Sequence, residues 1–337
     1  MTAPERGAED KLLEEALFEV KRVIVGQDRM VERMFTAVLA RGHCLLQGVP
    51  GVAKTLAVKT LAQVAGGHFA RLQFTPDLIP SDITGTRVYR PSQETFSIEP
   101  GPVVANFVLA DEINRAPAKV QSALLEVMGE QQVTIGGTTI PVPQPFLVLA
   151  TQNPIESEGV YQLPEAQRDR FLLKVDIPTP SESEELAILY RMSVDPPRPR
   201  PVLTPERLIA LQRSADEVFV HHAVAEYAVR LVCATRELAG PGRRLAHGAG
   251  PRATLGLVAA ARALALLRGR AYVLPEDVHD LAHDVVAHRL VLSFDALADG
   301  VTGAEIVDEV LAGVEQPRVS PRQAATSAKG DPEGAAA

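Results

Sequence analysis

Cysteine is scarce in this chain, and positive charge is not in excess. Only two of the 337 residues are cysteines, Cys44 and Cys233, and they lie far apart inside apolar segments. This pattern favours small buried thiols in a reducing compartment over a disulfide. The formal net charge is −8 and the pI about 5.6, so tight nonspecific binding to nucleic-acid phosphates is not expected.

Long apolar runs are also missing, and we expect no secretory signal. No run approaches the roughly 18 residues that cross a bilayer, and the richest stretch, "ATLGLVAAARALALL", is interrupted by Arg262. The opening residues, "MTAPERGAED", are polar and acidic, unlike a secretory signal. We therefore expect a cytoplasmic protein without membrane insertion. The length indicates about two domains.

Short apolar runs alternate with helical stretches in the first half of the chain. The runs are 43–47, 68–74, 106–111, 146–153 and 171–177. Several have apolar residues at consecutive positions, which is typical of a parallel sheet covered on both faces. Helical periodicity lies between them, as at 54–65 and 117–130. The alternation predicts an α/β domain with a parallel five-stranded sheet between helices. Within it, Gly136-Gly137 separates two β-rich runs and predicts a hairpin with a two-residue turn.

Strands largely disappear after about residue 178. A serine-rich cap opens a helix there, and helical stretches follow at 205–219, 222–239, 252–268 and 275–290. We predict an N-terminal helical extension (1–17), an α/β nucleotide-binding core (18–178), an α-helical lid domain (179–317) and a disordered tail (318–337).

The stretch "QGVPGVAKTLAV", residues 47–58, has the spacing of a phosphate-binding loop. Gly48, Gly51, Lys54 and Thr55 stand at the offsets that a phosphate cradle requires, between an expected strand and an expected helix. Ala53 stands where a third glycine is usual. Alanine is tolerable there if its backbone is helix-like and costly only if φ is positive. The alternative is a glycine-rich turn with a chance lysine.

An acidic pair follows a second apolar strand in "NFVLADEINR". Asp111, at the strand's carboxyl end, is placed to hold the water shell of a metal, and Glu112 to orient an attacking water. A solvated strand end would explain one carboxylate, but two of them in the same chain as a phosphate loop favour a catalytic site.

Weaker signals come from other polar residues. Thr151, Gln152 and Asn153 end a strand, where one uncharged side chain would lie beside Asp111 and reach the γ-phosphate or the water. Arg168 and Arg170 flank an aspartate, an arrangement that is usually a surface ion pair. Arg252 follows a proline at a helix start, where the helix dipole disfavours a cation, so it is a candidate for contact with an external phosphate.

Together these motifs resemble the AAA+ ATPases and, within them, the MoxR family, over roughly residues 18 to 315. The segments that carry the resemblance are "VIVGQDRMVERM", "LLQGVPGVAKT", "QFTPDLIPSDITG", "VLADEINRAP", "ATQNPIESEGVYQLPEAQRDRF", "GPRAT" and "LPEDVHDLAHDVVAHRL". The resemblance implies a P-loop AAA+ core followed by an all-α lid, and it makes Ala53 look like family usage. The segment 85–102 resembles an insert in helix 2, and the hairpin at 136–137 resembles an insert that faces the centre of a ring.

The resemblance also implies residue roles. By resemblance, Val25, Gly26 and Gln27 would contact the adenine. The Walker A loop that binds the phosphates would consist of Gly48, Val49, Pro50, Gly51, Val52, Ala53, Lys54, Thr55 and Leu56. Those implied for catalysis are Asp111 with Thr55 at the metal, Glu112 as the base, Asn153 as sensor 1, Arg252 as sensor 2 and Arg170 as an arginine finger. Arg168 departs from the family, in which a leucine is expected, and leaves open which arginine acts on the neighbouring subunit.

The implied function is Mg²⁺-dependent ATP hydrolysis by a homo-oligomeric ring, six-membered by resemblance. Such a ring would remodel or mature partner proteins, with a von Willebrand factor A domain protein as the expected partner. The alternatives are a nucleic-acid motor, a magnesium-chelatase-type motor subunit and an ATP-dependent binding switch with little turnover. The absence of charge from "VTIGGTTIPV" disfavours the nucleic-acid motor, and the absence of a "GAFTGA" loop from 85–102 disfavours a transcription activator.

Overall fold

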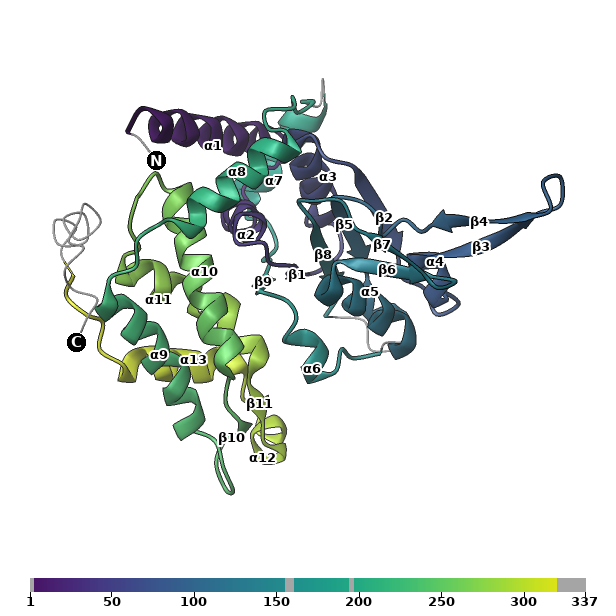
Figure 1. Cartoon of the computed structure of the whole chain (residues 1–337). Helices are drawn as coiled ribbons and strands as arrows, with labels where there is room; N and C mark the ends of the chain where they lie inside the picture. Colours follow the sequence, from purple (N-terminus) through teal and green to yellow (C-terminus); the bar gives the residue numbers. More distant parts are fainter. Residues whose placement is uncertain (1–2, 155–160, 194–196, 320–337) are drawn as a thin grey trace, which may run out of the picture. The chain divides into compact units, whose positions relative to one another are not determined.

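The computed structural model describes residues 3–154, 161–193 and 197–319 (Figure 1). The chain divides into two compact units, Lys11–Ala210 and the described residues that precede and follow it. The domain boundaries expected at 17/18 and 178/179 stay a prediction. The tail expected from residue 318 lies almost entirely outside the described residues.

A five-stranded parallel sheet forms the centre of the first unit, in the order β2-β5-β8-β1-β9. Its strands are β1 (Cys44–Gln47), β2 (Phe69–Gln73), β5 (Phe107–Asp111), β8 (Leu147–Gln152) and β9 (Leu173–Asp176). All five expected strands are confirmed. Because β5 and β8 separate β1 from β2, the chain crosses the sheet after β1. Such a crossover opens a crevice at the carboxyl ends of the strands, where ligands bind in open α/β sheets.

Helices cover the sheet because alternate strand residues point to opposite faces. Leu45, Val108 and Ala150 pack in one buried apolar cluster with the inner residues of α5 (Ala118–Glu130). The other main helices are α2 (Asp28–Leu39), α3 (Lys54–Ala65) and α7 (Glu182–Ser193), and the shorter ones are α4 (Pro80–Thr84), η1 (Ile113–Arg115) and α6 (Glu165–Arg168).

Two antiparallel hairpins are inserted into this unit. One consists of β3 (Gly85–Arg90) and β4 (Thr95–Pro100) and projects from the sheet (Figure 1). The other consists of β6 (Gln132–Ile135) and β7 (Thr138–Pro141), with Gly136 at φ 56° and Gly137 at φ 87°. Two consecutive positive φ angles are those of a two-residue hairpin turn, so the hairpin predicted at Gly136-Gly137 is confirmed.

A buried carboxylate ties helix α1 (Ala3–Val23) to the segment that follows α7. Glu19 is fully buried and pairs with Arg200 at 2.7 Å and Arg22 at 2.8 Å. Burial by itself would raise the pKa of Glu19, but the hydrogen bonds from Arg200 and Arg22 and the charge of Arg200 outweigh it and lower the pKa to about 2. Glu19 is therefore ionised at neutral pH and holds the extended segment at Arg200.

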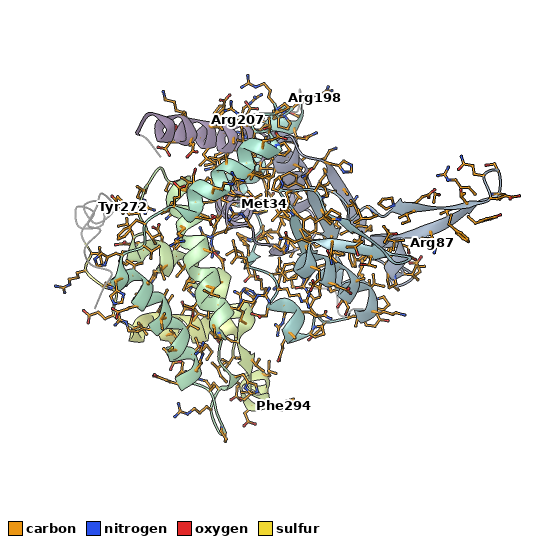
Figure 2. All side chains as sticks on the ribbon, in the orientation of Figure 1. Met34, Arg87, Arg198, Arg207, Tyr272 and Phe294 are labelled. Atoms are coloured by element: carbon orange, nitrogen blue, oxygen red, sulfur yellow. The ribbon has the colours of Figure 1, made fainter. Side chains whose placement is uncertain are left out.

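The second unit is helical, apart from a short ribbon of β10 (Leu245–His247) and β11 (Val291–Leu292). Its helices are the end of α8 (Pro205–Asp216), α9 (His222–Glu237), α10 (Pro251–Leu267), α11 (Pro275–Val286), η2 (Ala287–Arg289), α12 (Phe294–Ala298) and α13 (Gly303–Gly313). Tyr227 is fully buried in its core. Phe294, which is labelled in Figure 2, is 92% exposed. An α/β core followed by an α-helical region confirms the expected fold class. Of the described helices, none has the length and apolar character needed to cross a membrane.

Candidate functional site

The loop between β1 and α3 depends on two glycines for different reasons. A Cβ on Gly48 would lie 2.9 Å from the main-chain oxygen of Ile177, so only glycine fits that close approach. Gly51 has open space around it but a φ of +89°, a region that side chains disfavour. The local sequence therefore folds as a tight strand-to-helix turn, with Lys54 as the first residue of α3.

Ala53 has a left-handed backbone, with φ 61° and ψ 19°. This backbone is not helix-like, and its φ is positive. The methyl group of Ala53 is therefore expected to cost free energy at this position. Strain of this kind collects at functional sites, where the surrounding structure over-determines the backbone.

Replacing Ala53 with glycine is expected to raise the free energy of unfolding by up to about 1.6 kcal/mol. A left-handed backbone costs an L-residue roughly 1–2 kcal/mol, and the extra freedom of glycine in the unfolded chain offsets about 0.4–1 kcal/mol of that gain. Urea unfolding of the nucleotide-free protein measures the difference.

Ala62→Gly on the same helix is the matched control. Ala62 is buried in the helix interior, where glycine should lower the free energy of unfolding by about 1 kcal/mol. If Ala53→Gly destabilised the protein as much as Ala62→Gly, the backbone at position 53 would not be strained.

The side chain of Lys54 folds back over its own loop. Its Nζ donates hydrogen bonds to the main-chain oxygens of Gly48 and Gln152, the latter at 3.3 Å. Burial lowers the pKa of Lys54, and the nearby carboxylates of Asp111 and Glu112 oppose that shift. The ammonium thus stands between the loop and two strand ends, where phosphate oxygens could replace the carbonyl acceptors.

Asp111 is nearly buried and accepts hydrogen bonds from three side chains. Thr151 Oγ1 donates to its Oδ1 at 2.6 Å, and Thr55 Oγ1 donates to its Oδ2 at 3.3 Å. The guanidinium of Arg71 also pairs with Oδ2, at 2.6 Å. The structure therefore brings together Thr55 and Asp111, the two residues predicted to hold a metal.

Glu112 is held in a left-handed conformation at the end of β5, with φ 56° and ψ 50°. Its main-chain N–H donates to Thr151 Oγ1 at 2.8 Å. Its Oε2 accepts a hydrogen bond from Gln73 at 2.8 Å and pairs with Arg115 at 3.0 Å. These contacts orient the Glu112 carboxylate at the carboxyl ends of the strands, the side of the sheet on which Lys54, Thr55 and Asp111 also lie.

Arg71, Gln73 and Arg115 are residues of this site that sequence reasoning missed. Arg71 and Gln73 lie on β2, and Gln73 is in register with Asp111. Alternate polar residues in "FARLQF" could have marked them, but only the pairing of β2 with β5 places them beside the acidic pair.

An apolar pocket of about 290 Å³ adjoins the loop. The predicted residues that line it are Val25, Gln27, Gly51, Val52, Ala53 and Leu56, and α7 adds Ile188 and Met192. Gln27 is fixed by a hydrogen bond from its Nε2 to the main-chain oxygen of Pro178 at 3.1 Å. A mostly apolar wall with a few polar groups suits a flat aromatic ring.

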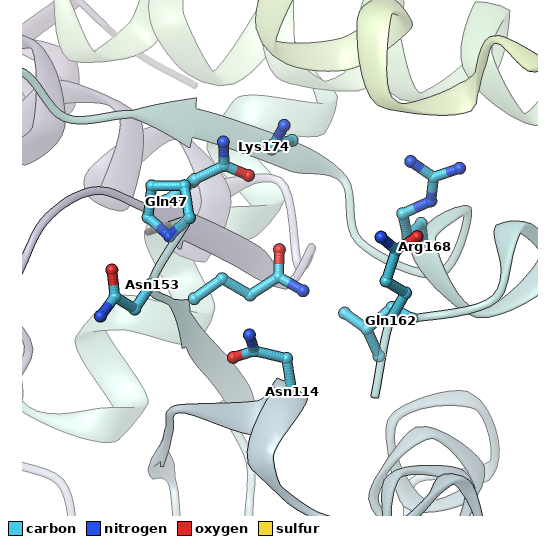
Figure 3. A pocket seen from close by; sticks show the side chains of 9 residues that line it. Gln47, Asn114, Asn153, Gln162, Arg168 and Lys174 are labelled. Carbon is cyan, nitrogen blue, oxygen red and sulfur yellow. The ribbon is translucent and has the colours of Figure 1, made fainter. Parts of the chain in front are cut away.

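Three of the remaining predicted residues lie in the same unit, but in different surroundings. Asn153 and Arg168 line a polar cavity at the carboxyl ends of β1 and β8, to which Lys174 of β9 also contributes (Figure 3). Arg170 is half-buried, and its guanidinium donates to the main-chain oxygen of Leu125 on α5. Arg252 is exposed in the first turn of α10 and belongs to the second unit.

The oxygen atoms of Thr55 and Asp111 fit a magnesium ion. Mg²⁺ takes hard oxygen ligands, with one or two protein groups completed by phosphate oxygens and water. A cage of three or more His, Cys, Asp or Glu residues is absent from the part of the chain that the structure describes, which agrees with this open donor set.

Two family models match separate parts of the chain. The model described as "ATPase family associated with various cellular activities (AAA)" matches residues 43–173, and "AAA lid domain" matches residues 242–310. The first match contains the loop, the acidic pair and four of the five strands of the sheet, and the second lies in the helical unit.

Several known proteins are similar over most of the chain. "Chaperone MoxR1" of Mycobacterium tuberculosis is 59% identical, over 93% of this chain and 84% of its own length. "Protein MoxR" of Methylorubrum extorquens is 32% identical, over 81% and 86%. A crystal structure of a Cytophaga hutchinsonii protein is 41% identical, covers 94% of this chain and 98% of its own, and superposes with a TM-score of 0.87.

Proposed function

This chain belongs to the MoxR family of AAA+ ATPases, and on that premise we propose that it hydrolyses ATP with Mg²⁺ as a subunit of an oligomeric ring. The ring would remodel or mature other proteins, as the word chaperone in the name of its Mycobacterium tuberculosis relative suggests. We also propose that the ring has six subunits and that its partner contains a von Willebrand factor A domain.

One observation carries this proposal: five residues associated with three strands meet at the carboxyl ends of the sheet. Lys54 and Thr55 follow β1, and Asp111 and Glu112 end β5, with Thr151 of β8 bridging the acidic pair. Phosphoryl transfer requires a cation for the phosphates, oxygen ligands for Mg²⁺ and a carboxylate for the attacking water. All three are within reach of the glycine-rich loop.

The residues divide the chemistry between them. Lys54 and the amides of loop 48–55 would bind and orient the phosphates, while Thr55 and Asp111 would hold Mg²⁺, which when bound neutralises phosphate charge. Glu112 would accept a proton from the attacking water, and Asn153 would help to position the water or the γ-phosphate. Val25, Gly26 and Gln27 would border the adenine.

The active site is proposed to be incomplete within one subunit. Arg170 of one copy would act on nucleotide bound to the next, and Arg252 would link the helical unit to the presence of the γ-phosphate. Assembly would then control turnover, because an arginine finger accelerates phosphoryl transfer by roughly 10³–10⁵-fold.

Lys54→Ala is expected to weaken ATP binding about 10- to 100-fold, since a hydrogen bond to a charged group contributes about 1.5–3 kcal/mol. Titration calorimetry with ATP measures the loss. Lys59→Ala is the matched control, because Lys59 is an exposed lysine on the same helix. Equal ATP affinities of Lys54→Ala and Lys59→Ala would show that Lys54 does not bind the phosphates.

ATP turnover across protein concentrations separates the competing functions. A specific rate that rises with concentration and then levels off supports an ATPase completed by assembly. A near-zero rate at every concentration supports a binding switch. Stimulation by single-stranded DNA that salt abolishes would support a nucleic-acid motor.

A further inference from the structure

A polar cavity of about 230 Å³ lies between α6 and the carboxyl ends of β1 and β8 (Figure 3). Its lining includes two cationic side chains, Arg168 and Lys174, and the amides of Gln47, Asn114, Gln152 and Asn153. Figure 3 shows the two cations across from the two asparagines. The roles assigned above to the catalytic residues do not use Lys174, Gln47 or Asn114.

The cavity holds two positive charges and, among the described residues, no carboxylate lines it. Burial lowers the pKa of Lys174, the charge of Asp176 opposes this, and the charge of Arg168 lowers the pKa further. Asp176 is a weak partner because its side chain is 70% exposed and 3.9 Å from Lys174 Nζ. Two like charges that are only partly exposed to water repel each other, and an anion between them would relieve that repulsion.

Two buried polar groups in the cavity wall also have no hydrogen-bond partner. Arg168 Nε is buried without an acceptor. Asn114 is 5% exposed, and its side-chain oxygen has no donor. The oxygen and nitrogen of an amide can be exchanged by rotation, so Asn114 can also present a donor. Buried groups of this kind are normally satisfied, and a bound ligand would satisfy them.

We infer that this cavity binds a small tetrahedral oxyanion of the phosphate class between Arg168 and Lys174. Guanidinium and ammonium groups are the usual partners of such anions, and amides supply further donors. Gln152 connects the cavity to the nucleotide loop, since its carbonyl accepts a hydrogen bond from Lys54 Nζ at 3.3 Å. Product phosphate is the natural occupant if the chain hydrolyses ATP, and only this part of the inference rests on the proposed function. Arg168 then acts within its own subunit.

Binding is tested on the full chain with saturating ADP, which keeps the nucleotide loop filled. Inorganic phosphate is titrated at constant ionic strength while the thermal unfolding midpoint is followed. A ligand of the folded state raises the midpoint in a saturable manner. We expect this rise in the wild type, at least a tenfold weaker apparent affinity in Arg168→Met and Lys174→Met, and no change in Lys119→Met. Lys119 is an exposed lysine on α5 that carries the same charge.

The absence of a phosphate-dependent shift in the wild type, or an equal shift in Arg168→Met, overturns the inference. Sulfate that binds as tightly as phosphate supports an oxyanion site but overturns the assignment to product phosphate. If the variants do not fold, ADP-loaded wild-type crystals soaked in selenate provide the test. An anomalous peak between Arg168 and Lys174 is expected, and its absence refutes the site.

The two proposals can fail separately. Lys54→Ala should lose ATP affinity yet keep phosphate binding in this cavity, whereas Arg168→Met should lose phosphate binding and keep ATP affinity. Loss of both ligands in both variants would show that the cavity is not an independent site.

Discussion

Glu112→Gln is expected to lower the ATP turnover rate by about 10²–10⁴-fold, because a positioned general base contributes about that factor. The amide has the shape of the carboxylate but cannot accept the proton of the attacking water. ATP affinity should stay close to that of the wild type, since Lys54 and loop 48–55 are unchanged. Steady-state phosphate release and ATP titration measure the two quantities.

The matched control is Glu14→Gln, which removes an exposed carboxylate on α1 without touching the sheet edge. Turnover by Glu112→Gln at the wild-type rate would show that Glu112 is not the base. If the variant binds ATP without hydrolysing it, it also serves as a trap. Partner proteins retained by Glu112→Gln with ATP, but not by Lys54→Ala, would test the proposed von Willebrand factor A domain partner.

Arg170→Ala is expected to lower turnover by about 10³–10⁵-fold, the effect of removing an arginine finger. Mixing it with Lys54→Ala should restore activity. In mixed rings an intact Arg170 from a Lys54→Ala subunit can serve the intact nucleotide loop of an Arg170→Ala subunit. The rate of the mixture, compared with the rates of the separate variants, is the measurement.

The contact between Arg170 and the main-chain oxygen of Leu125 makes a folding control necessary. Removing that contact could loosen α5, so thermal unfolding and assembly of Arg170→Ala should be measured alongside its rate. Two well-assembled variants that recover no activity on mixing would contradict action across the subunit interface. In the same mixing experiment, any turnover lost by Arg168→Ala should not be recovered, because Arg168 is assigned to a cavity of its own subunit.

The five strands, the Gly136-Gly137 hairpin and the main helices were predictable because their signals are local. Consecutive apolar residues mark a buried strand, and Gly136-Gly137 marks a tight turn by its backbone freedom alone. The offsets among Gly48, Gly51, Lys54 and Thr55 are likewise contained in eight consecutive residues. The roles of these residues stay predictions until the variants are measured.

Other features depend on residues far apart in the chain. The ion pair of Arg71 with Asp111 and the hydrogen bond of Gln73 to Glu112 require β2 to lie beside β5 in one register. Composition and spacing contain no information about that register. The same is true of Lys174, which reads as an ordinary strand residue until Arg168 is placed in the same cavity.

The sequence by itself determined the family, the order of the five core strands and the main helices along the chain and the candidate phosphate loop, because each is encoded in short runs of neighbouring residues. Only the tertiary structure decided that Ala53 and Glu112 have left-handed backbones and that Arg168 shares a cavity with Lys174. Backbone strain and charge clustering arise from the packing of distant segments, which must be in place before either can exist.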